Sequence, residues 1–232
     1  MSWPPLYKIK THRLAKSVKL RLISADELQI TVPNRFNLKH IDRILEENKD
    51  WIVTQLSARK LLPTTEFKLP QSVVLHGLEE LWKISYVACK TKLQVYQRPN
   101  FEIVLMGNIQ NISLCIKKII EWIKQYSKPL LLSILKQLSD EIGMPYVSSN
   151  IRDQKTLWGS CTSHHSISLN YKLIFMPKSV MRYVMIHELC HTRYLNHSKR
   201  FWDLVGKFDL HWQANKLILK RAKEFIPEWI KE

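Results

Sequence analysis

The strongest constraint on the fold of this 232-residue chain is an apolar segment after Pro177 that is too uniform to lie on a surface. Its apolar side chains are Val180, Met181, Tyr183, Val184, Met185 and Ile186. Val180, Tyr183 and Val184 recur at helical spacing, and the others broaden the apolar surface over most of the helix. Because a helix that is apolar nearly all round is a buried one, the segment predicts a core helix that begins after Pro177.

Three polar side chains follow at the carboxyl end of this segment: His187, Glu188 and His191. Residues four apart on an α-helix lie one turn above each other, so the two imidazoles face the same way. Glu188 lies about 100° further round the helix. Burying these groups is costly unless they are paired or coordinate a metal ion. Because zinc accepts two neutral imidazoles plus a third ligand, the sequence predicts a Zn²⁺ site that contains His187 and His191.

His197 is the predicted third zinc ligand. It lies just past Asn196, a residue type that tolerates the left-handed conformation with which helices end. Ser198 is then predicted to cap a new helix. A histidine in such a turn can return over the preceding helix and complete a three-histidine site with one coordination position left for water. The alternatives for the third ligand are His211 and Glu224.

Glu188 is the predicted catalytic residue. Zinc lowers the pKa of a coordinated water to about 7, and a carboxylate beside that water can take its proton. Glu188 would act as general base and then protonate the leaving amine, which hydrolyses a peptide bond of a polypeptide substrate. No cofactor other than zinc is predicted. Three side chains remain open as stabilisers of the oxyanion: Tyr171, Arg193 and Tyr194.

The net charge of +16, from 36 basic against 20 acidic side chains, adds nucleic acid as a candidate partner. The alternative function is therefore a nucleic-acid-binding protein whose zinc is structural. A structural zinc ion normally has four protein ligands, and only three are predicted here, which favours the enzyme. A third hypothesis combines the two functions in a protease that associates with DNA.

The compartment is predicted from the amino terminus and the cysteines. The first residues show no apolar core of a secretory signal before their charges, and no apolar stretch approaches the roughly 20 residues of a membrane span. The cysteines are irregularly spaced, which favours reduced thiols over a disulfide framework: Cys89, Cys115, Cys161 and Cys190. We expect a cytoplasmic protein without membrane contact, and the sequence does not indicate its oligomeric state.

The pattern of apolar residues predicts an α+β fold: a β-rich amino-terminal part, then a mainly helical part with a small sheet beside the active-site helix. Alternation predicts a β-hairpin over residues 18–32 and strands in 73–75, 82–87, 93–96, 101–105 and 166–175. Helices are predicted after Asn37 and over 109–142, the latter either continuous or broken near Pro129 and ending at Gly143. The expected regions are 1–108 and 109–232, with a soft boundary.

Several local features allow two interpretations. The segment Trp158–Cys161 shapes the floor of a cleft or forms a packed turn with a core tryptophan. The segment Ser168–Asn170 is an edge that pairs with substrate or an ordinary internal strand. Cys190 is expected to be a buried thiol. The pair Phe201-Trp202 is expected to pack beneath His197 and support it.

Beyond these patterns, the chain resembles a known family. His187-Glu188-Leu189-Cys190-His191, Asn196-His197-Ser198 and Phe201-Trp202 are similar to the YgjP-like metallopeptidases, relatives of the SprT-like zincins. Trp158-Gly159-Ser160-Cys161 and Ile167-Ser168-Leu169-Asn170 match the same family upstream. The resemblance implies a zinc-dependent peptidase fold, with a zincin-like catalytic part over residues 109–232.

Four departures from known patterns set limits to such resemblances. The histidine spacing is also that of the metzincin proteases, but Tyr194 replaces their glycine, and no methionine follows Met185 to form their methionine turn. Within the YgjP-like pattern, Leu157 stands where a basic residue is expected, and His164-His165 where a small turn residue is usual. Metzincin membership is therefore rejected, and the ligand spacing is kept.

Overall fold

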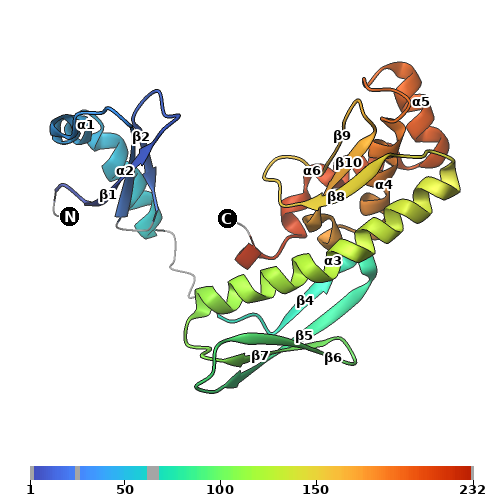
Figure 1. Cartoon of the computed structure of the whole chain (residues 1–232), viewed down its shortest axis with the longest axis horizontal. Helices are drawn as coiled ribbons and strands as arrows, with labels where there is room; N and C mark the ends of the chain where they lie inside the picture. Colours follow the sequence, from blue (N-terminus) through green and yellow to red (C-terminus); the bar gives the residue numbers. More distant parts are fainter. Residues whose placement is uncertain (1–2, 24–26, 62–67, 231–232) are drawn as a thin grey trace. The chain divides into compact units, whose positions relative to one another are not determined.

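The computed structural model describes residues 3–23, 27–61 and 68–230. The chain has an α+β fold, as predicted, and divides into two compact units, Met1–Glu66 and Phe67–Glu232 (Figure 1). The boundary expected near Asn108 falls inside the second unit, between a strand and the helix that packs on its sheet. That sheet and that helix share one hydrophobic core, so the chain divides further upstream.

The first unit contains a three-stranded sheet. Its strands are β1 (Leu6–His12), β2 (Lys19–Leu22) and β3 (Glu27–Pro33), in the order β1-β3-β2. β2 and β3 are antiparallel, with Leu20 opposite Ile30, which confirms the predicted hairpin. The sequence analysis missed β1, which pairs parallel with β3 and is exposed at almost every position. An exposed edge strand lacks the alternation of apolar side chains on which that prediction relied.

Two helices cover the buried face of this sheet. Asn37 accepts a hydrogen bond from the backbone N–H of Lys39 and begins a short 3-10 turn, Leu38–His40, which leads into α1 (Ile41–Glu47). α2 (Lys49–Leu61) follows after Asn48, whose side chain donates to the carbonyl of Ile44 at 2.8 Å. The predicted helix after Asn37 is therefore two helices. Together with β3 they bury Leu28, Ile30, Val32, Ile41, Leu45, Ile52 and Leu56.

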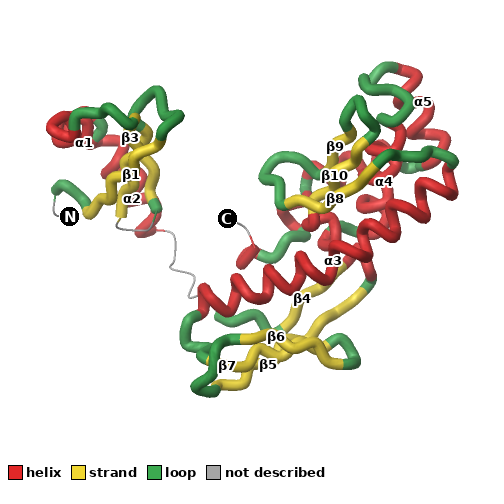
Figure 2. The backbone as a smooth tube through the Cα atoms, in the orientation of Figure 1, coloured by secondary structure: helices red, strands yellow, loops and turns green. Residues whose placement is uncertain are grey.

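A four-stranded sheet begins the second unit. It contains β4 (Ser72–Leu75), β5 (Glu80–Ala88), β6 (Gln94–Arg98) and β7 (Glu102–Gly107), in the order β4-β5-β7-β6. β5 and β7 are parallel, and the other pairs are antiparallel. The long helix α3 (Ile112–Ile142) crosses this sheet, as Figure 2 shows. Trp82 of β5 and Trp122 of α3 join the two layers, with ring centroids 4.8 Å apart.

α3 runs without interruption through Pro129, where the sequence analysis left a break open. Its start is fixed by Asn111, whose side chain accepts from the backbone N–H of Leu114 at 2.9 Å. Its end is Gly143, as predicted, in the left-handed conformation with φ 65°. The buried face continues on both sides of the proline, from Ile123 to Leu131, and this burial keeps the helix in one piece.

A second layer lies on the opposite side of α3 from the four-stranded sheet (Figure 2). A second sheet has the order β8-β10-β9, from β8 (Ser148–Arg152), β9 (Gly159–Cys161) and β10 (Ser166–Asn170). The predicted strand 166–175 ends at Asn170, because that side chain accepts from the N–H of Lys172 and caps the 3-10 turn Tyr171–Phe175. Beside the sheet lie α4 (Lys178–Cys190), α5 (Lys199–Phe208) and α6 (Trp212–Lys220).

α4 is the buried core helix that the sequence predicts. Its apolar side chains are at most 3% exposed: Val180, Met181, Tyr183, Val184, Met185, Ile186, Leu189 and Cys190. α4 contacts β9, α5, α6 and the 3-10 turn His76–Leu78 that follows β4. The two layers of the unit therefore meet on this helix.

The cysteines and the helices bear on the predicted compartment. All four cysteines are free, and Cys115 and Cys190 are buried. In the part of the chain that the structure describes, every helix is too short or too polar to cross a membrane.

Gly77 marks the contact between the two layers, and replacing it tests that contact. A Cβ atom there would lie 2.8 Å from Sδ of Met181 and 3.2 Å from the carbonyl oxygen of Ile174. We expect Gly77→Ala to lower the free energy of unfolding by about 1–3 kcal/mol through overpacking, as measured by urea denaturation. Gly206→Ala, where the nearest atom is 3.4 Å away, is the control and should cost nothing. If the two variants were equally stable, Gly77 would not be a close contact between the two layers.

Candidate metal centre and active site

Three histidines converge at the carboxyl end of α4. The Nε2 atom of His187 lies 3.2 Å from Nε2 of His191 and 3.0 Å from Nε2 of His197. The first two side chains extend from successive turns of the helix, and His197 lies in the loop that leads into α5. Within the described residues, this group of three is the one arrangement of histidine, cysteine or acidic side chains suited to hold a metal ion.

The protonation of these imidazoles fits a metal ion. The Nδ1–H of His191 donates to the backbone carbonyl of Tyr194 at 2.9 Å, which leaves the lone pair of Nε2 directed toward the other two rings. Burial lowers the pKa of His187 to about 3, and burial also lowers the pKa of His191. Neutral imidazoles with converging acceptor atoms repel each other unless a cation lies between them, so the three side chains fit a divalent metal.

Aromatic rings hold the histidines in place from α5. Phe201 is fully buried, and its ring stacks on His191 with centroids 4.5 Å apart. Trp202 stacks on His197 at 5.5 Å and on Trp212 at 4.5 Å. The predicted support by Phe201 and Trp202 is confirmed. The sequence analysis missed Trp212, because its contact depends on how α6 folds back against α5.

The loop between α4 and α5 reaches the site by a different route from the one predicted. α4 ends at Cys190, and Asn196 does not adopt a positive φ. Its side-chain oxygen instead accepts from the N–H of Ser198 at 3.3 Å. α5 begins at Lys199, as predicted, but the Ser198 side chain makes no capping hydrogen bond. The asparagine therefore shapes the loop through its side chain.

Glu188 lies beside the histidines with 5% of its surface exposed, and burial raises the pKa of its carboxyl to about 8. Gly159 of β9 packs directly against it. A Cβ atom on Gly159 would lie 2.6 Å from Cγ and 2.7 Å from Oε1 of Glu188. Only a glycine therefore lets β9 approach the carboxylate this closely. The segment Trp158–Cys161 shapes the cleft, the first of its two predicted interpretations.

A cavity of about 630 Å³ opens in front of these groups. Its lining residues are Thr156, Leu157, Trp158, Gly159, Tyr183, Val184, His187, Glu188, His197, Trp202, Lys216, Leu219 and Lys220. Lys216 lies over the ring of Trp202, with its Nζ 4.3 Å from the centroid. The sequence analysis missed Lys216 and Tyr183 as site residues, since only the fold brings α6 against the end of α4.

β9 is a free edge of the small sheet. β10 pairs with β8 and with β9, so it is an internal strand and not the substrate-pairing edge that was one of its two interpretations. The N–H of Asn170 donates to the carbonyl of Trp158, and the N–H of Thr162 to that of Ser166. By the alternation of an antiparallel pair, the backbone groups of Gly159 and Cys161 point away from β10.

The chain is similar to known metallopeptidases. The family model described as YgjP-like, metallopeptidase domain, matches residues 16–222. The chain belongs to the YgjP-like metallopeptidase family. This confirms the resemblance found in the sequence, and it makes the protein a peptide-bond hydrolase whose family implies a metal ion.

Two further comparisons set this metallopeptidase against individual curated proteins and solved structures. Among curated proteins, no sequence matches it. Among solved structures, the crystal structure of the metallopeptidase zymogen of Pyrococcus abyssi abylysin is 22% identical, with a TM-score of 0.36. That match covers 40% of this chain and 95% of the other.

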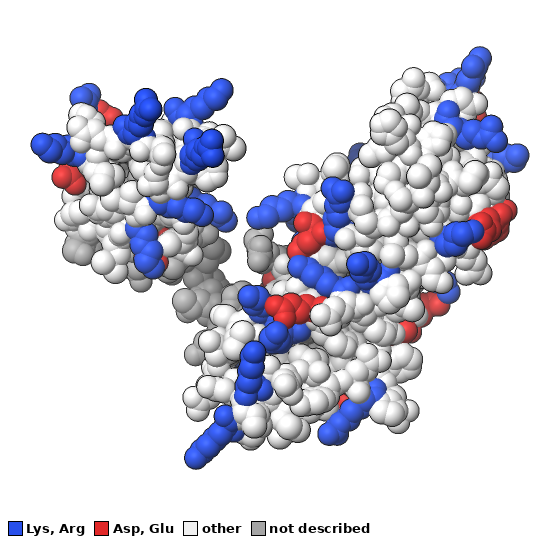
Figure 3. Space-filling model, in the orientation of Figure 1, with Lys and Arg blue, Asp and Glu red and all other residues white. Residues whose placement is uncertain are grey.

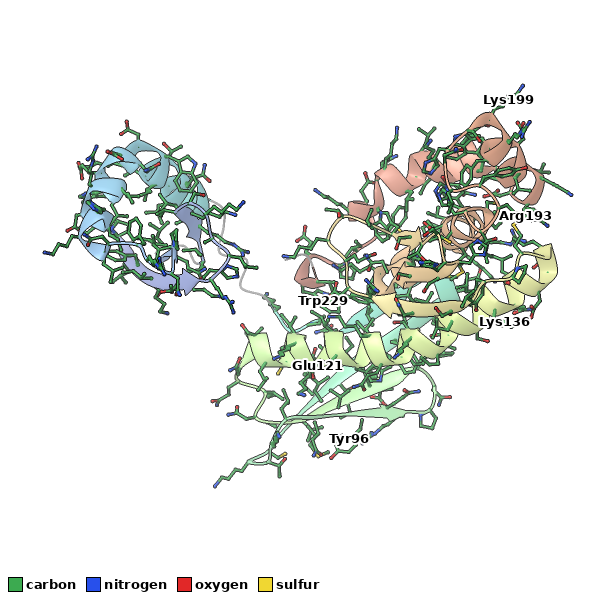
Figure 4. The ribbon with its side chains drawn as sticks, turned by 45° about the horizontal axis from the view of Figure 1, so that its top comes forward. Tyr96, Glu121, Lys136, Arg193, Lys199 and Trp229 are labelled. Carbon is green, nitrogen blue, oxygen red and sulfur yellow. The ribbon has the colours of Figure 1, made fainter. Side chains whose placement is uncertain are left out.

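Other side chains that the sequence singled out lie elsewhere in the metallopeptidase. None of the three expected oxyanion stabilisers lines the catalytic cavity. Tyr194 contributes its carbonyl to His191, and Arg193, labelled in Figure 4, is exposed after α4. Glu224, an alternative third ligand, pairs with Arg221 at 2.8 Å. His211, the other alternative, precedes α6 and is not in the histidine group.

The structure confirms the prediction for Cys190 and places the residues that depart from the family pattern. Cys190 is fully buried, and burial raises the pKa of its thiol to about 12. His164 and His165 are exposed in the turn before β10. His165 has a φ of 54°, which explains why a small turn residue is usual there. Leu157, where the family pattern has a basic residue, is 49% exposed and lines the cavity.

The contact between Gly159 and Glu188 can be tested by adding one methyl group. We expect Gly159→Ala to retain bound metal, because no imidazole is touched, and to lose about a hundredfold in kcat, because the carboxylate is displaced. The control is Ser160→Ala, whose side chain lies on the opposite face of β9. Metal content and hydrolysis of an unfolded protein would be measured for both. Full activity of Gly159→Ala would show that the close approach has no role.

Proposed function

We propose that the protein is a zinc-dependent peptidase in which His187, His191 and His197 bind the ion. The observation that carries this proposal is the convergence of three imidazoles, with Nε2 of His187 3.2 and 3.0 Å from Nε2 of His191 and His197, next to a buried carboxylate in a cavity. Zinc bound there would supply a Lewis acid that lowers the pKa of water to about 7 and polarises a carbonyl group. Three protein ligands leave a coordination position for that chemistry.

Glu188 moves the proton in the proposed reaction. One carboxylate oxygen takes a proton from the attacking water while the water oxygen bonds to the scissile carbonyl carbon. The carboxylate oxygen of Glu188 then delivers the proton to the amide nitrogen as the C–N bond breaks. The products are a carboxylic acid and an amine. Gly159 keeps β9 against the carboxylate and limits the positions it can adopt.

The free edge of β9 and Lys216 are proposed to position the substrate. The outward N–H and C=O groups of Gly159 and Cys161 suit an extended peptide that adds a strand to the sheet. Lys216 lines the same cavity and is held over Trp202, so its ammonium group is available to an oxygen that gains negative charge during attack. Lys216 thereby replaces the three stabilisers expected from the sequence.

The proposal is tested by separating zinc binding from catalysis. We expect Glu188→Gln to contain zinc like the wild type and to lose cleavage of a labelled unfolded protein, because the amide cannot accept the proton. We expect His197→Ala to lose most of both. His164→Ala, in an exposed turn, is the control. Zinc is measured by mass spectrometry after dialysis. Normal cleavage by Glu188→Gln would rule out its role, and full zinc occupancy of His197→Ala would rule out that ligand.

A second candidate function, binding to nucleic acid, is favoured by the register of the first sheet. Lys8 and Arg21 flank Gln29 on either side, and Lys10 and Lys19 flank Thr31 in the same way. Residues paired across strands share a face, so four exposed cations lie together on the sheet surface opposite the core. Within the described residues of this sheet, the one acid is Glu27, which pairs with Lys8 at 2.8 Å.

We propose that this basic face of the first sheet contacts nucleic acid phosphates. The test is the salt dependence of duplex DNA affinity, because each phosphate contact contributes about 0.9 to the slope of log K against log salt. Replacing Lys8, Lys10, Lys19 and Arg21 by glutamine should reduce that slope. The control replaces four helix-side cations of the same unit, Arg35, Lys39, Arg43 and Lys49, and should leave it unchanged. A flat salt response of the wild type would reject the proposal.

A further inference from the structure

A second cavity of about 510 Å³ adjoins the catalytic one. The two cavities share five lining residues: Thr156, Leu157, Trp158, Leu219 and Lys220. They are therefore neighbouring compartments of one cleft, with the loop before β9 and the end of α6 as the shared wall. A polypeptide whose scissile bond lies at Glu188 can extend over this wall into the second compartment.

The second compartment is lined by many cations. Its five lysines come from five different elements. Lys124 lies on α3, Lys155 in the loop before β9 and Lys172 in the 3-10 turn after β10. Lys220 ends α6, and Lys223 lies in the 3-10 turn Ala222–Glu224. The one acid in the lining is Asp153. Its carboxylate binds Lys124 at 2.6 Å and Lys172 at 3.3 Å, so this acid is shared by two of the five lysines.

The other three lysines keep uncompensated charges. Lys155, Lys220 and Lys223 are exposed, and the described residues offer none of them an ion-pair partner. On the face shown in Figure 3, basic side chains of the second unit gather near the start of α3, with a few acids among them. Like charges around one cavity repel each other, and an anionic ligand relieves that repulsion.

The floor of this compartment is suited to a peptide. It is apolar, with contributions from Ile120, Leu219, Ala222, Ile226 and Ile230. The loop on its wall is fixed by Asn170, whose side chain donates to the carbonyls of Gln154 and Leu157 at 2.8 and 2.9 Å.

We propose that the second compartment is a specificity pocket for an acidic segment of the polypeptide substrate. Carboxylates of the segment bind Lys155, Lys220 and Lys223, while its aliphatic carbons lie on the apolar floor. This inference rests on the proposed peptidase function. A peptide is favoured over nucleic acid because a cavity of about 510 Å³ with an apolar floor admits side chains and excludes a duplex.

The test compares two charge-reversed enzymes. Lys155→Glu/Lys223→Glu reverses two of the three unpaired cations of the pocket, and Lys90→Glu/Lys92→Glu makes the same change in net charge in the loop between β5 and β6. Zinc content and thermal midpoint are checked first, so that a folding defect is recognised. Cleavage of a mixed peptide library by the wild type, read by mass spectrometry, then identifies the positions where acids are preferred.

Matched peptides that carry glutamate or glutamine at those positions give the decisive ratio. We expect the wild type to favour the glutamate peptide about tenfold in kcat/KM, because the ion pairs form in a partly desolvated pocket. The pocket variant should lose this preference, and the Lys90/Lys92 variant should keep it. The position of the preferred acids relative to the scissile bond should be the same in the wild type and the control.

Each other outcome contradicts a different part of the inference. If the zinc-containing wild type cleaves no peptide of the library, the proposed peptidase function fails, and the inference fails with it. Cleavage without preference for glutamate, or a preference that survives in the Lys155/Lys223 variant, overturns the inference alone. Inhibition by a single-stranded oligonucleotide that depends on Lys155 and Lys223, without any acid preference, would assign the pocket to nucleic acid instead.

Discussion

The burial of α4 is the constraint on which the catalytic part of the chain depends. Its apolar side chains face α3, the small sheet, α5 and α6, and a helix held on every side cannot rotate without exposing some of them. The positions of His187 and Glu188 at its carboxyl end are fixed as a result. β9 and α5 then approach that end as closely as Gly159 and Phe201 allow. The geometry of the site therefore follows from the packing of one helix.

Much of this site is visible in the sequence, because its information is local. The spacing of His187 and His191 reflects one helical turn, and the apolar segment before them reflects burial. Trp212 and Lys216 carry no comparable signal, since they reach the site only when α6 folds back. Likewise β1 was missed because edge strands do not alternate, and α3 continues through Pro129 because tertiary packing outweighs the local cost of the ring.

Positive charge is arranged differently in the two units. In the first unit, register places Lys8, Lys10, Lys19 and Arg21 on one exposed sheet face. In the second unit, lysines from separate elements surround a concave compartment next to the catalytic cavity. A net charge of +16 says nothing about this difference, which depends entirely on where the fold places each side chain.

The hydrogen bond from His191 to the carbonyl of Tyr194 has a consequence for how such a site can change over time. Its acceptor belongs to the main chain, so replacing the tyrosine side chain leaves the acceptor in place. Point substitution at Tyr194 therefore affects the packing of that side chain against the core and leaves the hydrogen bond intact. Insertion or deletion between His191 and His197 would move the carbonyl and the third imidazole together. The geometry of the site therefore depends on the length of this loop more than on its composition.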